Sequence, residues 1–184
     1  MFARRCADNG IACVKFDFYG CGESDGDFSE MRYMDEVEQA KAIYLWASEQ
    51  PWCDRDNMFP AGHSMGGAIV SNIIPQLQFL QGAVMWAPGN VVYYDISSRV
   101  HAVPGHYEEL YDIGGLMMSS EFFTSEKDRY RQAGGRLRQR GAYHTWGSWM
   151  RRFRFTRWDH IWTCMAGKGP SGNNKRGQSS VYFG

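Results

Sequence analysis

The sequence predicts an α/β fold, in which helices flank a parallel sheet. Two features of the first half of the chain carry this prediction: short apolar runs alternate with amphipathic stretches, and polar or glycine-rich turns separate them. The resulting strand–helix–strand–helix–strand order produces a parallel sheet with right-handed crossovers. With 184 residues, the chain is long enough for one domain with a hydrophobic core.

Three short apolar runs are expected to be strands, and we expect them to be adjacent and parallel. Residues 11–17 are rich in β-branched and aromatic side chains, and residues 57–62 and 82–87 form similar runs. Pro60 lies inside the second run. Because proline has no amide donor for the ladder, this strand should be weakened.

Helices are predicted before and between these strands. Residues 2–9 indicate the end of a helix, which an Asn-Gly pair closes. Ser29 can cap a helix over residues 31–49, where apolar side chains recur at three- and four-residue spacing. Small and branched residues predict a further helix over residues 65–77.

The strongest chemical motif follows the second predicted strand. Its sequence, Gly62-His63-Ser64-Met65-Gly66, has the Gly-x-Ser-x-Gly pattern of a nucleophile elbow, and Gly67 follows it. The pattern alone arises by chance in roughly one chain in twenty of this length, and would then mark a glycine turn with a surface serine. A strand before it and a helix after it favour the elbow. In that interpretation Ser64 is the catalytic nucleophile, and the backbone N–H of Met65 is an oxyanion donor.

A second glycine-rich segment, from Asp17 to Ser24, follows the first predicted strand. No Gly-Lys-Ser or Gly-Lys-Thr sequence follows it, so the segment does not fit a phosphate-binding loop. We interpret its glycines as a turn that shapes the rim of the site and carries no chemistry.

Together these motifs resemble the α/β-hydrolase superfamily. The segments FDFYGCGESDGDFS, AGHSMGGAIVSNI and MWAPGN are similar to cinnamoyl- or feruloyl-esterase-like and serine-aminopeptidase-like members, over about residues 1–133. The resemblance implies a serine hydrolase that forms an acyl-enzyme on Ser64, and a lid over the acyl pocket after the sixth strand of the family. Residues 89–130 lie at that place, and their aromatic side chains indicate an acyl group with an apolar or aromatic body.

The family also requires an acid and a histidine after Ser64, and neither stands in a suitable context. Asp159-His160 follows no apolar strand, His144 is placed no better, and His63 is a motif residue and not the base. The early strands of the family, with their His-Gly oxyanion loop, would precede residue 1. We therefore expect the activity of this chain to be impaired by several orders of magnitude, and neither His144 nor His160 to reach Ser64.

The zero net charge conceals two oppositely charged parts. Residues 1–133 carry 10 Lys and Arg against 19 Asp and Glu, whereas residues 134–184 carry 10 Lys and Arg against one acid. We predict an α/β-hydrolase core fragment at residues 1–88, a lid-like insertion at 89–133, and an aberrant, disordered basic tail at 134–184.

One hypothesis explains the tail: residues from about 135 are translated out of frame. Read one base further on, the codons of residues 142–148 permit Pro-Ile-Ile-His-Gly-Asp, which is the strand and acid motif that the family needs. The encoding DNA tests this hypothesis, since codons that cannot yield the hexapeptide would exclude it.

The alternative to a hydrolase of small-molecule esters or amides is a non-catalytic chain, either a truncated remnant or a binding module with a basic tail. Arginines interleaved with aromatic residues at 151–158 suit single-stranded nucleic acid, but no nucleic-acid-binding fold is recognisable, so we expect no such partner. Neither a metal nor an organic cofactor is expected, since serine acyl transfer needs none.

Cysteine usage and hydropathy predict the compartment. Five scattered cysteines contain no Cys-x-x-Cys pair, and the N-terminus has no apolar signal segment. No run of about 18 apolar residues predicts a membrane span. These features indicate a cytoplasmic protein, and they leave the oligomeric state open.

Overall fold

The computed structural model describes residues 2–89, 97–98, 100–106, 109–122, 161–166 and 180–182, and for the last two ranges it describes the strand backbone. The predicted alternation of helices and strands is confirmed in the first half of the chain, although all three predicted helices are shorter than expected. In chain order the elements are α1 (Phe2–Ala7), β1 (Ile11–Phe16), the 3-10 helix η1 (Phe28–Glu30), α2 (Tyr33–Ser48), the 3-10 helix η2 (Arg55–Asn57), β2 (Met58–His63), α3 (Met65–Ile73), β3 (Val84–Trp86), β4 (His101–Ala102), β5 (Leu110–Ile113), β6 (Leu116–Ser119), β7 (Ile161–Ala166) and β8 (Ser180–Tyr182).

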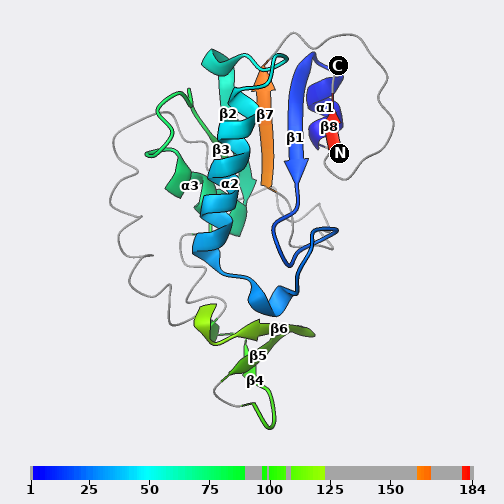
Figure 1. Ribbon diagram of the computed structural model, residues 1–184, viewed down its shortest axis with the longest axis vertical. Helices are drawn as coiled ribbons and strands as arrows, with labels where there is room; N and C mark the ends of the chain where they lie inside the picture. Colours follow the sequence, from blue (N-terminus) through cyan, green and yellow to red (C-terminus); the bar gives the residue numbers. More distant parts are fainter. Residues whose placement is uncertain are drawn as a thin grey trace.

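The main sheet has five strands in the order β3-β2-β7-β1-β8 (Figure 1). β2 and β3 are parallel neighbours, with Ala61 opposite Val84. The expectation that β1 and β2 are also neighbours is wrong, because β7 lies between them and runs antiparallel to both. Antiparallel pairing of β2 would by itself count against an α/β-hydrolase sheet. However, β1 and β2 are parallel to each other, as the crossover through α2 requires, and the parallel β2–β3 pair retains the expected alternation.

The tail contributes two strands that were not expected from the sequence. Residues 161–166 form β7, and residues 180–182 form β8 at the outer edge of β1. The missed signal is the run Ile-Trp-Thr-Cys-Met-Ala, whose β-branched, aromatic and apolar residues suit a strand. A gap between β1 and β2 would leave backbone N–H and C=O groups without partners, and β7 supplies those partners. The other residues of 134–184 lie outside the described part of the chain, so the disorder expected there stays a prediction.

Pro60 lies inside β2 without interrupting it. Parallel pairing with β3 begins one residue further on, at Ala61, so on that side the proline has no partner residue. On the other side it lies opposite Thr163 of β7. Pro60 therefore lies just outside the β2–β3 ladder, where a proline without an N–H is tolerated in a strand. This position explains why β2 continues through the proline.

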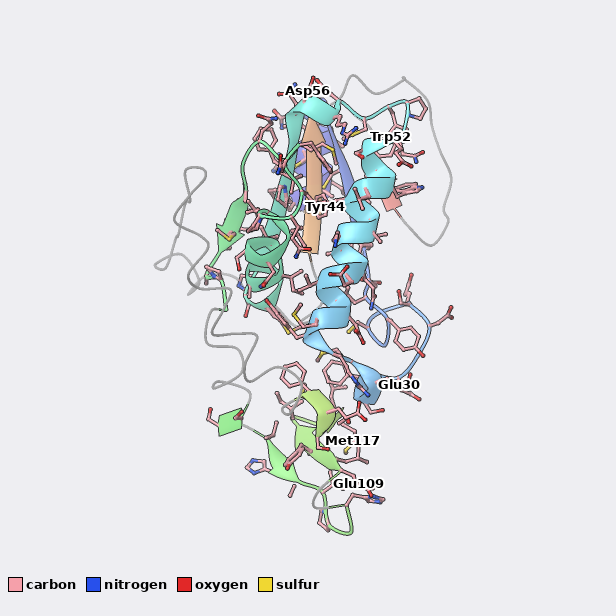
Figure 2. The ribbon with its side chains drawn as sticks, turned by 60° about the vertical axis from the view of Figure 1, so that its left-hand side comes forward. Glu30, Tyr44, Trp52, Asp56, Glu109 and Met117 are labelled. Carbon is pink, nitrogen blue, oxygen red and sulfur yellow. The ribbon has the colours of Figure 1, made fainter. Side chains whose placement is uncertain are left out.

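The helices enclose the core on the sheet. α2 crosses in front of the sheet in Figure 1 and contacts α3, which lies against β2, while α1 contacts β1. The buried face of α2 follows the predicted spacing: Val37, Ala40, Tyr44 and Ala47 have no exposed surface. Figure 2 shows Tyr44 on the side of α2 that faces the sheet.

A small antiparallel sheet of β4, β5 and β6 lies beyond η1, at the end toward which β1 runs (Figure 1). Met118 and Phe122 are buried in the same core cluster as Phe18 and Met31, so the small sheet is packed onto the main body. Figure 2 shows Glu30 at the end of the main body that faces Met117 and Glu109 of this region. The small sheet belongs to the predicted lid-like insertion, and its role as a lid stays a prediction.

Candidate active site

Ser64 lies alone between the last residue of β2 and the first residue of α3. Its backbone has φ 53° and ψ −118°, and a positive φ is the strained geometry that a nucleophile elbow gives its serine. Among the described non-glycine residues, only Ser64 and Ala87 have positive φ. A side-chain-bearing residue keeps such a conformation only where its surroundings hold it, and this strain gathers at functional sites. Ser64 therefore has the turn geometry of a nucleophile elbow.

Two glycines of the motif permit this turn, because other backbone atoms occupy the space that a side chain would need. A Cβ built on Gly62 would lie 2.3 Å from the carbonyl oxygen of Gly66 and 2.7 Å from the amide nitrogen of Gly67. A Cβ on Gly67 would lie 2.9 Å from the Cα of Pro88. The start of α3 thus passes directly against the end of β2, and only glycine leaves room for this close approach at the two positions.

The start of α3 provides a favourable electrostatic environment beside Ser64. The first N–H groups of an α-helix have no acceptor within the helix, and the helix dipole is positive at this end. Met65 is the first residue of α3, so its N–H belongs to this set. Negative charge that develops next to Ser64 would be stabilised at this position.

His63 is the last residue of β2, where it is half-buried and lies opposite Trp86 of β3. Burial lowers the pKa of its imidazole below the usual range, because the charged form loses solvation. The expectation that His63 is a motif residue and not the base stays a prediction.

The glycine-rich loop after β1 is held by its own side chains. The Asp17 carboxylate accepts the N–H of Glu23 at 3.2 Å, and it fills the space that a Cβ on Gly22 would need. The Tyr19 hydroxyl donates to the Glu30 carboxylate at 2.8 Å. This bond lowers the pKa of Glu30 and raises the pKa of the Tyr19 phenol. The contacts are those of a structural turn.

The segment that follows β3 contacts the elbow, and this was not anticipated from the sequence. The Ser64 N–H donates to the carbonyl oxygen of Trp86 at 2.9 Å, and the Gly89 N–H donates to the carbonyl oxygen of Ser64 at 2.7 Å. The sequence signal that could have revealed this contact was the Pro88-Gly89 pair, which indicates a turn directly after the predicted strand at 82–87.

The residues considered for the acid and the base are not described. Asp159, His160 and His144 lie outside the described ranges, so the expected separation of both histidines from Ser64 stays a prediction. β7 begins at Ile161, opposite Gly62, so the described tail strand starts at the end of the sheet that carries the elbow.

No group of three or more His, Cys, Asp or Glu side chains that could hold a metal ion occurs in the described ranges. Among the described helices, none combines the length and the apolar character that crossing a membrane requires.

Comparison with known families agrees with this geometry. The sequence model of the family described as "Serine aminopeptidase, S33" matches residues 1–107, which is more than half of the chain and includes the whole elbow. The chain belongs to the serine aminopeptidase S33 family. Because the S33 family is part of the α/β-hydrolase superfamily, the chain has a hydrolase lineage, and the resemblance inferred from the motifs is confirmed.

Two similar curated proteins come from Escherichia coli, and both are described as the uncharacterized 31.7 kDa protein in the traX-finO intergenic region. Each is 30% identical to this S33 member over 94 residues, which are 46% of this chain and 33% of the relative. The chain therefore spans about a third of the length of these relatives. Their descriptions name no substrate, so the similarity informs lineage alone.

Proposed function

We propose that this chain carries the nucleophile of a serine hydrolase that acts on carboxylic esters. The observation that carries the proposal is the strained turn at Ser64, with φ 53°, between β2 and α3 of an S33 family member. The Ser64 hydroxyl oxygen attacks the ester carbonyl, the bond to the alkoxy group breaks, and the serine proton leaves with the alcohol. Water then hydrolyses the acyl-enzyme, which releases the carboxylic acid and restores the Ser64 hydroxyl. The Met65 N–H donates to the oxyanion of each tetrahedral intermediate.

We propose that the small sheet is part of a lid over the acyl pocket. The carboxyl ends of parallel strands lie at one edge of a sheet, so the end of β1 and the elbow after β2 share that edge. The small sheet lies beyond this end of β1 and is tied to the main body by an ion pair between Arg32 and Glu121. An insertion rich in aromatic residues suits a small-molecule ester or amide whose acyl group has an apolar or aromatic body.

We propose further that the activity of this chain is impaired. No residue after Ser64 stands in a recognisable context for the triad acid or the triad histidine. A serine hydroxyl without a general base is a weak nucleophile, whereas the oxyanion donor at the start of α3 can still promote reaction with an activated reagent. The alternative is a chain whose elbow is a structural relic and whose Ser64 has no reactivity of its own.

Fluorophosphonate labelling with peptide mapping separates these possibilities. The reagent phosphonylates an activated serine hydroxyl and releases fluoride. We expect slow labelling of the wild-type chain at Ser64 and no labelling of the Ser64→Ala variant. Ser24, which is exposed in the loop after β1, serves as an internal control and should stay unmodified. Absence of an adduct at Ser64 would overturn the proposed function and favour the relic.

Two histidine variants test the proposed impairment. If neither histidine serves as a base, His144→Ala and His160→Ala should each change the labelling rate of Ser64 by less than about threefold. A loss of roughly 100-fold or more in either variant is the size expected on removing a general base, and would mean that the triad is complete.

The cytoplasm is the compartment that we propose, since the cysteine pattern predicts no disulfide framework. We also propose that the basic tail has no specific nucleic-acid partner. Gel-shift assays with single-stranded and double-stranded DNA and RNA test this, because non-specific charge binding weakens steeply with salt. A complex that persists at physiological salt and prefers one sequence would contradict the proposal.

A further inference from the structure

The segment Trp86–Gly89, which we call the clamp segment, binds both backbone polar groups of Ser64 from the neighbouring strand. The Ser64 N–H donates to the carbonyl oxygen of Trp86 at 2.9 Å, and the Ser64 carbonyl oxygen accepts the N–H of Gly89 at 2.7 Å. Pro88 lies against Gly67, where a Cβ would come within 2.9 Å of the proline Cα. The clamp segment therefore holds the strained residue on both sides and contacts the helix that follows it.

Ala87 turns the clamp segment toward the elbow at a cost in backbone strain. Its φ is 41°, in the left-handed region that residues with a side chain avoid. Ala87 also precedes Pro88, and a residue before proline is normally held in the extended region. Such a conformation persists only where the surroundings over-determine it. The two hydrogen bonds to Ser64 and the contact of Pro88 with Gly67 are those surroundings.

We propose that the clamp segment positions the oxyanion donor. The carbonyl group of Ser64 and the N–H of Met65 belong to one planar trans peptide unit, so they point in opposite directions and turn together. The Ser64 carbonyl oxygen is held by Gly89 and also accepts the N–H of Ala68 at 3.2 Å. Because the two groups turn together, holding the Ser64 carbonyl group also fixes the direction in which the Met65 N–H points. Gly89 is therefore a positioning residue, an inference that rests on the proposed role of Ser64.

Replacement of Gly89 by proline tests the inference, because proline removes the N–H, and Gly89→Ala is the matched variant that keeps it. Gly89 is not among the glycines with positive φ, so alanine imposes no left-handed strain there. The quantity measured is the rate of fluorophosphonate labelling at Ser64 in the full chain, corrected for the folded fraction from urea unfolding. Gly82→Ala, at a site distant from the elbow in sequence, should leave this rate unchanged.

We expect the Gly89→Pro chain to be labelled at least about 30-fold more slowly than the Gly89→Ala chain, since loss of one oxyanion donor costs roughly 10²–10³ in rate. If the Gly89 N–H only stabilised the fold, its loss would lower the folded fraction of the chain. The corrected labelling rates of Gly89→Pro and Gly89→Ala would then be equal. Equal corrected rates would overturn the clamp and leave the proposed function standing.

Hydrogen exchange at the wild-type Gly89 amide is the second measurement. It tests the Gly89 hydrogen bond directly, without the variants and without labelling of Ser64, so it applies even if Gly89→Pro fails to fold. Exchange as slow as at the Ser64 amide supports the hydrogen bond that defines the clamp. Exchange as fast as in an exposed loop overturns it.

Discussion

Replacement of Gly62 by alanine should destabilise the chain strongly, because it places a methyl group inside the elbow. The new Cβ would lie 2.3 Å from the Gly66 carbonyl oxygen, about 1.1 Å short of the 3.4 Å at which ordinary contact begins. The three nearest atoms all belong to the backbone of α3, so no flexible side chain can turn away to relieve this clash. Overpacking of this kind costs about 1–3 kcal/mol, and we expect the upper end, about 3 kcal/mol of unfolding free energy.

The matched control for this prediction is Gly82→Ala. There the added Cβ would lie 3.6 Å from the ring of Phe59, an ordinary contact, so the change in stability should stay within about 0.5 kcal/mol. Urea unfolding followed by tryptophan fluorescence measures both variants. With a slope of about 1–3 kcal/mol per molar urea, the midpoint of Gly62→Ala should fall by roughly 1–3 M. Equal midpoints for the two variants would refute the tight packing of the elbow.

Three further predictions follow from named contacts. Tyr19→Phe removes the hydrogen bond that lowers the pKa of Glu30, so NMR titration should show that pKa rising toward its ordinary value; an unchanged pKa would refute the assigned cause. Burial lowers the pKa of His63, so the stability that the neutral imidazole contributes is present above its unfolded pKa of about 6.5 and is lost as pH falls below it. Lowering the pH from about 7.5 to about 5 should therefore reduce the wild-type urea midpoint more than that of His63→Gln, and equal responses would argue against this burial. Cys13 lies opposite Cys164 in the β1–β7 register, where Cα atoms are about 4.5–5.5 Å apart and a disulfide can form. Excess oxidised glutathione should produce that crosslink in the full chain, whereas crosslinks scattered among the other cysteines would contradict the register.

The conformation of Ser64 could be predicted from the sequence because it depends on local chemistry. Glycine or small residues on both sides of a serine, between a strand and a helix, leave room for a turn that bulkier residues would block. The buried face of α2 was predictable for a similar reason, since helical spacing brings Val37, Ala40, Tyr44 and Ala47 to one side.

The position of β7 could not be predicted in the same way, because strand order depends on pairing between distant segments. Residues 161–166 suit a strand, but nothing in their sequence specifies β1 and β2 as neighbours. The clamp segment was missed because its contacts with Ser64 are backbone hydrogen bonds, which side-chain patterns do not record. Pairing through backbone groups also requires little of the side chains. A strand at 161–166 therefore does not exclude translation out of frame, and the codons of residues 142–148 still decide that hypothesis.

Reaction with p-nitrophenyl acetate most directly tests the claim that Ser64 is a nucleophile without a recognisable base. Intact-mass measurement and peptide mapping would follow acetyl groups on the wild-type chain and on Ser64→Ala. We predict that one acetyl group accumulates on Ser64 and is released slowly, since deacylation requires a base to activate water, and that Ser64→Ala acquires none at this position. Rapid turnover beyond one equivalent would contradict the proposed impairment. Equal acetylation of both chains, without modification of Ser64, would contradict its role as the nucleophile.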